Sequence, residues 1–196
     1  MTKIIAVDID ETLSETIDAA LKYHHYTIKN IPIIRSEITD YNIRNIPKCK
    51  EQGISQADGI IFFDEFLEGK DNTSAKTVLW AKEKLQEWKD AGYTIKIITG
   101  RPDTQQEQTK QRVQENFPNL FDDIIFANYF RAQEKSKGDI CKEIGASVMI
   151  EDNLDFAQKI AEKGTLVYLL DKPRNQQYSN TNPNIIKVAS RNDIIL

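Results

Sequence analysis

Residues 4–13 read Ile-Ile-Ala-Val-Asp-Ile-Asp-Glu-Thr-Leu, a short apolar run that ends in acidic residues. Such a run, followed by a polar turn, is typical of a strand in a parallel sheet that is covered on both faces. Asp8 and Asp10 would stand at the carboxyl end of this strand, where their burial is costly unless a cation or a proton compensates the charge. We therefore expect this stretch to contain functional residues of a catalytic or binding site, or else to form a turn whose acids cap the next helix.

Similar apolar runs recur along the chain, and helix-like stretches lie between them. This alternation predicts an α/β fold with a parallel sheet flanked by helices. Strands are expected at residues 4–7, 95–98, 124–127, 148–150, 166–170 and 185–188. Helices are expected at residues 78–88, 104–117, 136–145 and 154–163. Ser136, with Asp139 three residues later, predicts a capping arrangement at the start of the third of these helices.

The alternation is interrupted between residues 14 and 74, an interval too long for an ordinary loop between a strand and a helix. The interval contains aromatic and acidic clusters together with apolar residues of its own. We expect it to form a small, mainly helical domain inserted after the first strand, with residues 1–13 and 75–196 as the core. Residues 171–184, which are rich in proline and asparagine, are expected to form a loop.

Length and composition indicate an ordinary globular protein. The chain has 196 residues, of which 40% are apolar and 29% are charged. Its 26 basic and 30 acidic residues give a net charge of −4, which argues against a broad surface for duplex DNA or for an anionic membrane. Two cysteines, Cys49 and Cys141, are too few for a disulfide framework, and the first apolar run is too short for a signal peptide or a membrane span. We expect a cytoplasmic protein that binds neither nucleic acid nor membrane.

Polar residues also follow later strands, and each such group at the end of an expected strand is called a polar station below. Asp8 and Asp10 are the first station, and Thr99-Gly100-Arg101-Pro102, after the expected strand at 95–98, is the second. A hydroxyl group and free backbone N–H groups at the start of a helix can cradle a phosphate group. The same four residues would also suit a simple turn between a strand and a helix, in which Thr caps the helix and Pro occupies its first turn.

Two further stations follow later strands. Lys137, with Lys135 as the alternative, precedes the helix after the strand at 124–127 and could neutralise a bound phosphate, although exposed lysines are usually solvated. Glu151 and Asp152 directly follow the strand at 148–150, with Asp155 nearby. Paired acids in this place can bind Mg²⁺ through their oxygen atoms, or they can cap the next helix.

All four stations fall at carboxyl ends of expected parallel strands, the edge where ligands bind in open α/β sheets. In this order they resemble the haloacid dehalogenase superfamily, whose motifs are DxDx(T/V), a Thr or Ser after the second strand, a Lys, and a pair of acids. The resemblance covers residues 3–13 and about 76–170, and it implies a Rossmann-like core. It says little about the inserted residues.

The resemblance implies a role for each station. Asp8 would be the nucleophile that forms an aspartyl-phosphate, and Asp10 would be the general acid and base. Thr99 and Lys137, which count as catalytic, would bind the phosphoryl oxygens. Gly100 and Arg101 lie where they could also bind the phosphate, although Arg101 could equally be a surface residue or form an ion pair. The Mg²⁺ ligands would be Asp8, Asp10 and Asp152, with Asp10 contributing its backbone carbonyl as is usual in the family. Whether Glu151 or Asp155 assists at the metal stays open.

Asp10 favours a phosphatase, because dehalogenases of the superfamily typically lack the second aspartate. Within the superfamily the chain is most similar to the 5′(3′)-deoxyribonucleotidase group and its bacterial relatives, which insert a C1-type cap between the first two motifs. That similarity rests on the strings DIDETL at 8–13, ITGRP at 98–102, IEDN at 150–153 and LDKP at 170–173. Cap aromatic residues of that group stack on the base, which makes candidates of Tyr41, Phe62, Phe63 and Phe66; alternatively, they form the core of the cap.

We therefore expect a Mg²⁺-dependent phosphomonoester hydrolase that acts on a nucleoside monophosphate or another small phosphorylated metabolite. One alternative is a phosphatase for the 3′ ends of nucleic acids, although the chain has no basic patch interleaved with aromatic residues. Another is a receiver-like domain that holds an aspartyl-phosphate without turning it over. The sequence indicates neither an oligomeric state nor the substrate.

Overall fold

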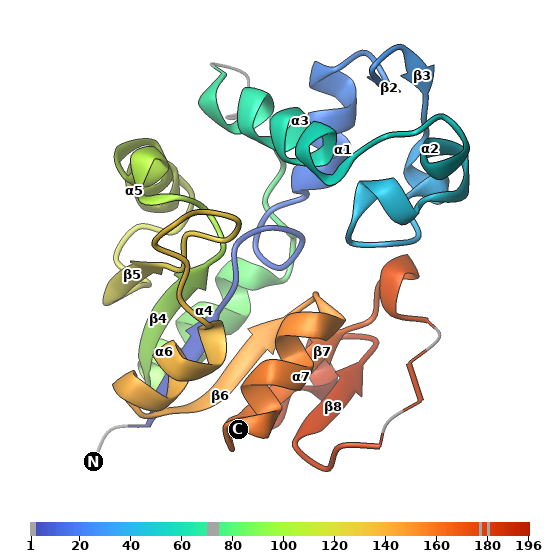
Figure 1. Cartoon of the computed structure of the whole chain (residues 1–196). Coiled ribbons are helices and arrows are strands. Elements are labelled where there is room, and N and C mark those ends of the chain that lie inside the picture. Colours follow the sequence, from blue (N-terminus) through green and yellow to red (C-terminus); the bar gives the residue numbers. More distant parts are fainter. Residues whose placement is uncertain (1–2, 70–74, 177, 180) are drawn as a thin grey trace.

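The computed structural model describes residues 3–69, 75–176, 178–179 and 181–196. A parallel sheet in the strand order β5-β4-β1-β6-β7-β8 forms the centre of the larger part of the chain (Figure 1). Its strands are β1 (Ile4–Val7), β4 (Thr94–Thr99), β5 (Asp123–Phe126), β6 (Ala146–Glu151), β7 (Leu166–Leu170) and β8 (Ile185–Val188). The predicted α/β class and parallel sheet are confirmed.

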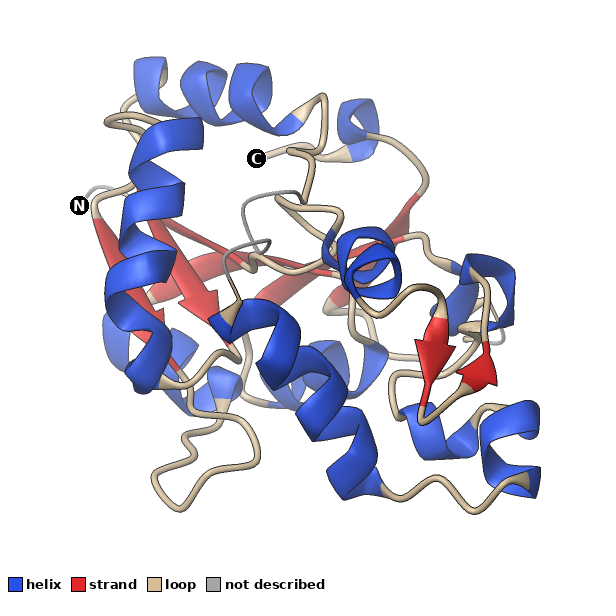
Figure 2. Cartoon of the chain, turned by 90° about the horizontal axis from the view of Figure 1, so that it is seen from above, coloured by secondary structure: helices blue, strands red, loops and turns tan. Residues whose placement is uncertain are grey.

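Helices pack on both faces of the sheet, and Figure 2 shows them around the strands from above. They are α4 (Ala81–Asp90), α5 (Gln106–Asn116), α6 (Lys137–Ile144) and α7 (Leu154–Glu162). Alternate residues of β1 point to opposite faces: Ile5 packs in a cluster with α4, and Ala6 packs in a cluster with α6 and α7. Burial on both faces explains why the strands are continuous apolar runs.

The register of the sheet sets the position of the polar stations. Val7, the last residue of β1, lies opposite Ile97 on one side and Ile150 on the other. The residues that follow on all three strands therefore reach the same carboxyl edge. The backbone N–H of Asp8 continues the ladder by donating to the carbonyl of Ile150 at 3.0 Å.

Helix α6 begins and ends where it was predicted to, with Ser136 before its first residue and Gly145 after its last, but its start is not capped as expected. Gly145 adopts the left-handed conformation, with φ of 68°, which ends the helix. The capping interaction expected between Ser136 and Asp139 is wrong: within the described chain, the Ser136 side chain makes no capping hydrogen bond. Asp139 instead lies 2.8 Å from the ammonium group of Lys163 at the end of α7.

The expected inserted segment, residues 14–74, is called the insert below, and its described residues 14–69 lie over the carboxyl edge of the sheet (Figure 1). It contains α1 (Thr16–Tyr23), the antiparallel pair β2 (Thr27–Ile28) and β3 (Ile31–Pro32), α2 (Pro47–Glu51) and α3 (Gln56–Glu68). Its apolar side chains form a cluster of their own, distinct from the two clusters on the sheet. The expected end of the insert at residue 74 lies outside the described residues.

Two chain segments side by side connect the insert to the sheet. The N–H of Glu15 donates to the carbonyl of Lys76 at 2.8 Å, and the N–H of Val78 donates to the carbonyl of Leu13 at 2.9 Å. Short 3₁₀ turns occur at Arg35–Glu37, Ile43–Asn45, Asp103–Gln105, Pro173–Asn175 and Arg191–Asp193. Among the described residues, no helix has the length and apolarity needed to cross a membrane.

Candidate active site

Asp8 lies directly after β1 and is buried, with 4% of its surface exposed. Its Oδ1 accepts a hydrogen bond of 2.7 Å from the ammonium group of Lys137. Burial raises the pKa of Asp8 well above its usual range; Lys137 opposes this shift, and neighbouring carboxylates reinforce it. An acid in such surroundings ionises readily only when more positive charge is brought to it.

Lys137 is the first residue of α6, and it is buried between two acids. Its Nζ donates to Asp8 at 2.7 Å and to Glu151 at 2.8 Å. Burial alone would lower the pKa of Lys137, but the two carboxylates outweigh this effect and raise it, so the side chain stays cationic. Lys135, the alternative left open by the sequence, is exposed. The structure thus places Lys137, rather than Lys135, beside the first aspartate.

Three buried carboxylates come together at this edge: an oxygen of each of Asp8, Glu151 and Asp152 lies within 4.8 Å of the others. Glu151 is oriented by the N–H groups of Asp152 and Asn153, which both donate to its Oε1 at 3.1 Å. Asp8 and Asp152 belong to the expected metal ligands, whereas Asp10 was expected to contribute its backbone carbonyl, which is not one of these carboxylate oxygens. Asp155 is exposed in the first turn of α7, away from this trio.

The donor set of this trio fits Mg²⁺. The cation prefers carboxylate oxygens and few protein ligands, and here several negative charges share a buried space that contains one ammonium group. Burial and the charge of Glu151 raise the pKa of Asp152 to about 7, although Arg174 lowers it. A divalent cation would oppose these upward shifts, because its charge favours the ionised carboxylates.

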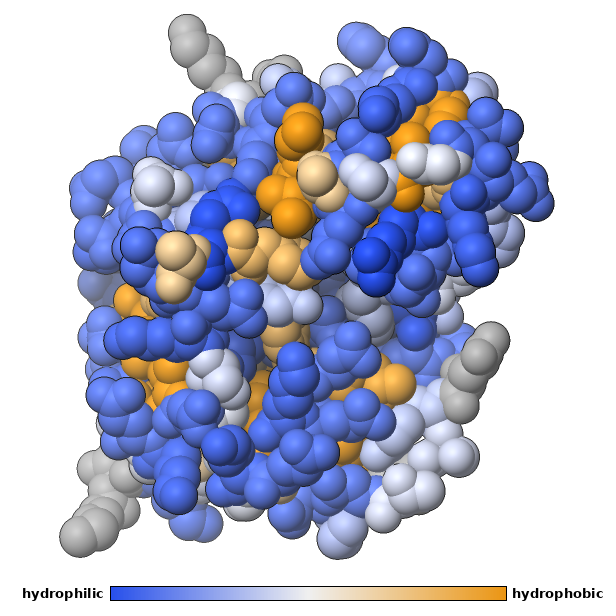
Figure 3. All heavy atoms as spheres, in the orientation of Figure 1, coloured by the Kyte–Doolittle hydropathy of each residue, from blue (hydrophilic) through white to orange (hydrophobic). Residues whose placement is uncertain are grey.

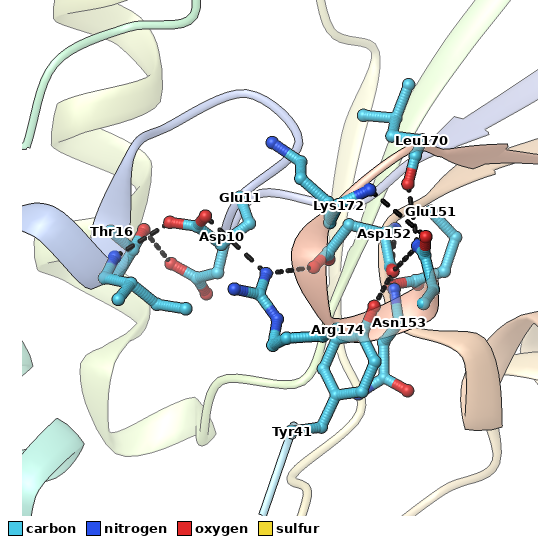
Figure 4. A network of polar contacts seen from close by, with 12 residues as sticks. Asp10, Glu11, Thr16, Tyr41, Glu151, Asp152, Asn153, Leu170, Lys172 and Arg174 are labelled. Carbon is cyan, nitrogen blue, oxygen red and sulfur yellow. Dashed lines mark hydrogen bonds and ion pairs between the residues drawn. The ribbon is translucent and has the colours of Figure 1, made fainter. Parts of the chain in front are cut away.

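Asp10 has a different environment. Its carboxylate accepts hydrogen bonds from Arg101, at 2.6 Å from Nη2 and 3.0 Å from Nε, and from the hydroxyl of Thr16 at 2.6 Å. Burial alone would raise the pKa of Asp10, but the charge of Arg101 and these hydrogen bonds lower it. In Figure 4 the carboxylate points toward Thr16 and away from Asp152. The side chain of Asp10 is therefore held apart from the carboxylate trio.

The station after β4 lies at the same edge. Thr99 is fully buried, and its hydroxyl oxygen accepts from the N–H of Arg101 at 3.3 Å. Gly100 and Arg101 both line the cavity described below. The guanidinium of Arg101, expected to bind phosphate, is engaged by Asp10 and by Thr109, the latter at 3.3 Å. Its direct partner in the structure is thus a carboxylate.

Sequence reasoning missed two charged residues of the site, and Figure 4 shows both. Arg174, in the turn after β7, donates to Asp152 at 2.8 Å and lies 3.6 Å from Glu11. Glu11 has a positive φ of 64° and also pairs with Arg35 of the insert. The signal for Arg174 was its place directly after the string LDKP at 170–173.

A cavity of about 240 Å³ lies between the insert and this edge of the sheet. The carboxylate trio and Lys137 line it, together with apolar and aromatic side chains and with further polar residues of the insert such as Asp40, Gln56 and Asp64. Figure 3 shows apolar side chains on the surface around α3, beside the cavity. This volume suits a small molecule rather than a polymer.

Only part of the expected aromatic set faces this cavity freely. Phe66 is 0% exposed and packs in the core of the insert, as the alternative expects. Phe62, at 4%, also packs in that core but lines the cavity as well. Phe63 is partly buried and lines the cavity. Tyr41 also lines it, but its hydroxyl donates a hydrogen bond to the backbone carbonyl of Asp152.

No protein-family model matches the sequence, and no protein with a curated description matches it. Solved structures do match. A haloacid dehalogenase-like hydrolase from Streptococcus pneumoniae is 14% identical, with 87% of this chain and 85% of that chain covered and a TM-score of 0.63. A HAD family hydrolase from Deinococcus radiodurans, with bound phosphate and sodium, is 18% identical, with coverage of 86% and 80% and a TM-score of 0.58.

A third match is a Bacillus subtilis protein named as a HAD hydrolase and bound to magnesium. It is 15% identical, with 94% of this chain and 92% of that chain covered and a TM-score of 0.56. Likeness at this level of identity concerns the course of the backbone. The chain therefore has the fold of the haloacid dehalogenase-like hydrolases.

Proposed function

We propose that this protein is a Mg²⁺-dependent phosphomonoester hydrolase that works through an aspartyl-phosphate on Asp8. The observation that carries the proposal is the buried contact between Asp8 and Lys137, at 2.7 Å, beside two further carboxylates at the cavity. A carboxylate held between cations can approach a phosphate dianion that it would otherwise repel. Phosphate in one fold neighbour and magnesium in another support this chemistry.

In the first step, an Oδ atom of Asp8 attacks phosphorus, and the bond between phosphorus and the ester oxygen breaks. The electron pair of that bond goes to the leaving oxygen, which takes a proton from Asp10. Lys137 and the hydroxyl of Thr99 would hold the phosphoryl oxygens. Bound Mg²⁺, held by Asp8 and Asp152 with the backbone carbonyl of Asp10 or with Glu151, would supply positive charge that shields the phosphoryl group.

In the second step, water attacks the phosphorus of the acyl phosphate and gives a proton to Asp10. The bond between phosphorus and the Asp8 oxygen breaks, and the carboxylate and inorganic phosphate are released. Asp10 as it stands, with Arg101 and Thr16 bonded to it, suits this role of base. The first step needs the same group as an acid, so loss of these bonds when substrate binds would raise its pKa as required.

The insert, residues 14–74, would be a cap that selects the substrate. Four aromatic side chains line the cavity, Tyr41 and Phe63 from the insert and Tyr129 and Phe130 from the loop after β5. Aromatic walls favour a flat leaving group, so a nucleoside monophosphate is the preferred substrate among small phosphorylated metabolites. Both cysteines are free and buried, which supports the proposal that the protein is cytoplasmic.

The test is hydrolysis of p-nitrophenyl phosphate with and without EDTA, followed by a panel of nucleoside monophosphates and sugar phosphates. Asp8→Asn should abolish turnover, and Asp155→Asn, an exposed acid close to the site, is the matched control. Turnover that ignores EDTA, or full activity of Asp8→Asn, would refute the proposal. A stable phosphorylated Asp8 would favour the receiver-like alternative, and preference for a 3′-phosphorylated oligonucleotide would favour an end phosphatase.

A further inference from the structure

Asp152 is held at each of its polar groups. Its N–H donates to Glu151 at 3.1 Å, and its Oδ2 accepts from Arg174 at 2.8 Å. Its carbonyl oxygen accepts from the side-chain amide of Asn175 at 3.1 Å and also from the hydroxyl of Tyr41 (Figure 4). Because the carboxylate belongs to the proposed metal site, whatever orients this backbone also orients a ligand.

Tyr41 differs from the other three partners in its origin. Glu151, Arg174 and Asn175 follow or end strands of the sheet, whereas Tyr41 belongs to the insert, between its two 3₁₀ turns. The insert therefore reaches across the cavity to the loop that carries Asp152.

The contact is a double one. The Tyr41 ring lies under the guanidinium of Arg174, 5.0 Å from its central carbon to the ring centroid, while the hydroxyl bonds the carbonyl of Asp152. Burial and the charge of Asp152 raise the pKa of Tyr41, so the hydroxyl remains a donor across the neutral range. Arg174 in turn binds the Asp152 carboxylate. Tyr41 thus contacts the backbone carbonyl of Asp152 directly and supports its carboxylate through Arg174.

We propose that Tyr41 is a positioning residue through which the insert orients Asp152 for a divalent cation. This inference rests on the proposed function only in requiring that Mg²⁺ binds at the carboxylate trio. It has a reciprocal consequence: if docking of the insert strengthens cation binding, cation binding must strengthen docking of the insert by the same factor. The metal and the closed cavity would then form together.

The size of the effect follows from the contacts. A single hydrogen bond contributes modestly, so Tyr41→Phe, which keeps the ring under Arg174, should weaken Mg²⁺ binding about three- to tenfold. Tyr41→Leu removes the ring as well and should weaken it further. Tyr23→Phe deletes the same hydroxyl from another half-buried tyrosine of the insert, which packs against Phe66, and should leave the affinity unchanged.

The experiment is calorimetric titration of the full chain with MgCl₂, in the absence of substrate, for the wild type and the three variants. Amide hydrogen exchange at residues 13–17 and 75–78, where the insert joins the sheet, provides the second readout. Mg²⁺ should slow this exchange in the wild type and in Tyr23→Phe, and less so in Tyr41→Phe. The activity lost by Tyr41→Phe should return at saturating Mg²⁺.

The possible results separate the two proposals. Equal Mg²⁺ affinity in the wild type and in a folded Tyr41→Leu would overturn the role of Tyr41 and leave the phosphatase proposal standing. Mg²⁺ coupling without any phosphatase activity would support the role of Tyr41 and refute the proposed function. Absence of Mg²⁺ binding to the wild type would refute both.

Discussion

Arg101 grips the carboxylate of Asp10 with two hydrogen bonds, one of 2.6 Å from Nη2 to Oδ1 and one of 3.0 Å from Nε to Oδ2. The two residues come from neighbouring strands, since Asp10 follows β1 and Arg101 follows β4. The pairing lowers the pKa of Asp10 and so holds the proposed acid and base in its ionised form. The strength of this grip should therefore appear in the pH dependence of the reaction.

Replacing Arg101 with Met should raise the pKa of Asp10, because burial would then act without its main opposing charge. The base form needed for hydrolysis of the acyl phosphate would appear only at higher pH, so the acid limb of the kcat profile should move upward. We also expect a loss of about 2 kcal/mol in the free energy of unfolding, the usual effect of leaving a charged group without its partner. Rate profiles from pH 5 to 9 and denaturant titration measure the two effects.

Lys110→Met, which removes a basic residue from the exposed face of α5, is the control for the loss of a positive charge. An acid limb that stays in place in Arg101→Met would show that Asp10 does not limit the rate. It would then be necessary to seek the base elsewhere.

Asp152 predicts a pH-dependent response to Mg²⁺. Its pKa in the folded, metal-free protein is about 7, above the ordinary value of 3.8, so the folded state binds more protons than the unfolded state between these values. The contribution of this group to stability is therefore present at low pH and is lost as the pH rises toward 7. Mg²⁺ competes with that proton, so it should stabilise the protein little at pH 5 and more at pH 8.

Thermal unfolding with and without MgCl₂ would measure this response at each pH. Asp152→Asn should remove most of the dependence, because Asn does not titrate, whereas the exposed Asp155→Asn should retain it. A rise in Tm with Mg²⁺ that has the same size at pH 5 and pH 8 would contradict the prediction.

Lys137 and Lys135 form a natural pair for mutation, since they are two residues apart and only Lys137 is buried. Lys137→Met leaves Asp8 and Glu151 as neighbouring buried carboxylates without their shared cation, so activity should fall by a factor of at least about 100. The variant should also be less stable at pH 8 than at pH 5, because protonation relieves the repulsion between the two acids. Lys135→Met should behave like the wild type in both assays.

The sequence predicts long apolar strands well and very short strands poorly. Strands β1 and β7 have the predicted bounds, 4–7 and 166–170, because each is an apolar run that ends at an aspartate. The pair β2 and β3 was not predicted, because each strand has only two residues and their turn depends on positive φ values at Lys29 and Asn30. Two residues make only one repeat of the strand pattern, so periodicity cannot reveal elements this short.

Which side chains of the site contact each other was harder to predict than the edge of the sheet at which they lie. Sequence order placed the polar stations at one edge, but it could not show that Arg101 turns to Asp10 rather than to open space. Arg174 lies in a stretch without periodicity, and it reaches Asp152 only because β7 pairs with β6 in the sheet. Such contacts depend on register and side-chain rotamers, which no local pattern determines.

The two phenylalanines Phe63 and Phe66 should separate substrate binding from stability. Phe66 is fully buried in the core of the insert, so Phe66→Ala should lower the free energy of unfolding by about 3 to 5 kcal/mol. Phe63 is only partly buried and lines the cavity, so Phe63→Ala should cost less stability and should raise KM for a nucleoside monophosphate about tenfold. Its kcat/KM for a sugar phosphate, which has no aromatic leaving group, should change much less. Denaturant titration and steady-state kinetics of both variants test this contrast, and an unchanged nucleotide KM in Phe63→Ala would show that this wall of the cavity does not contact the substrate.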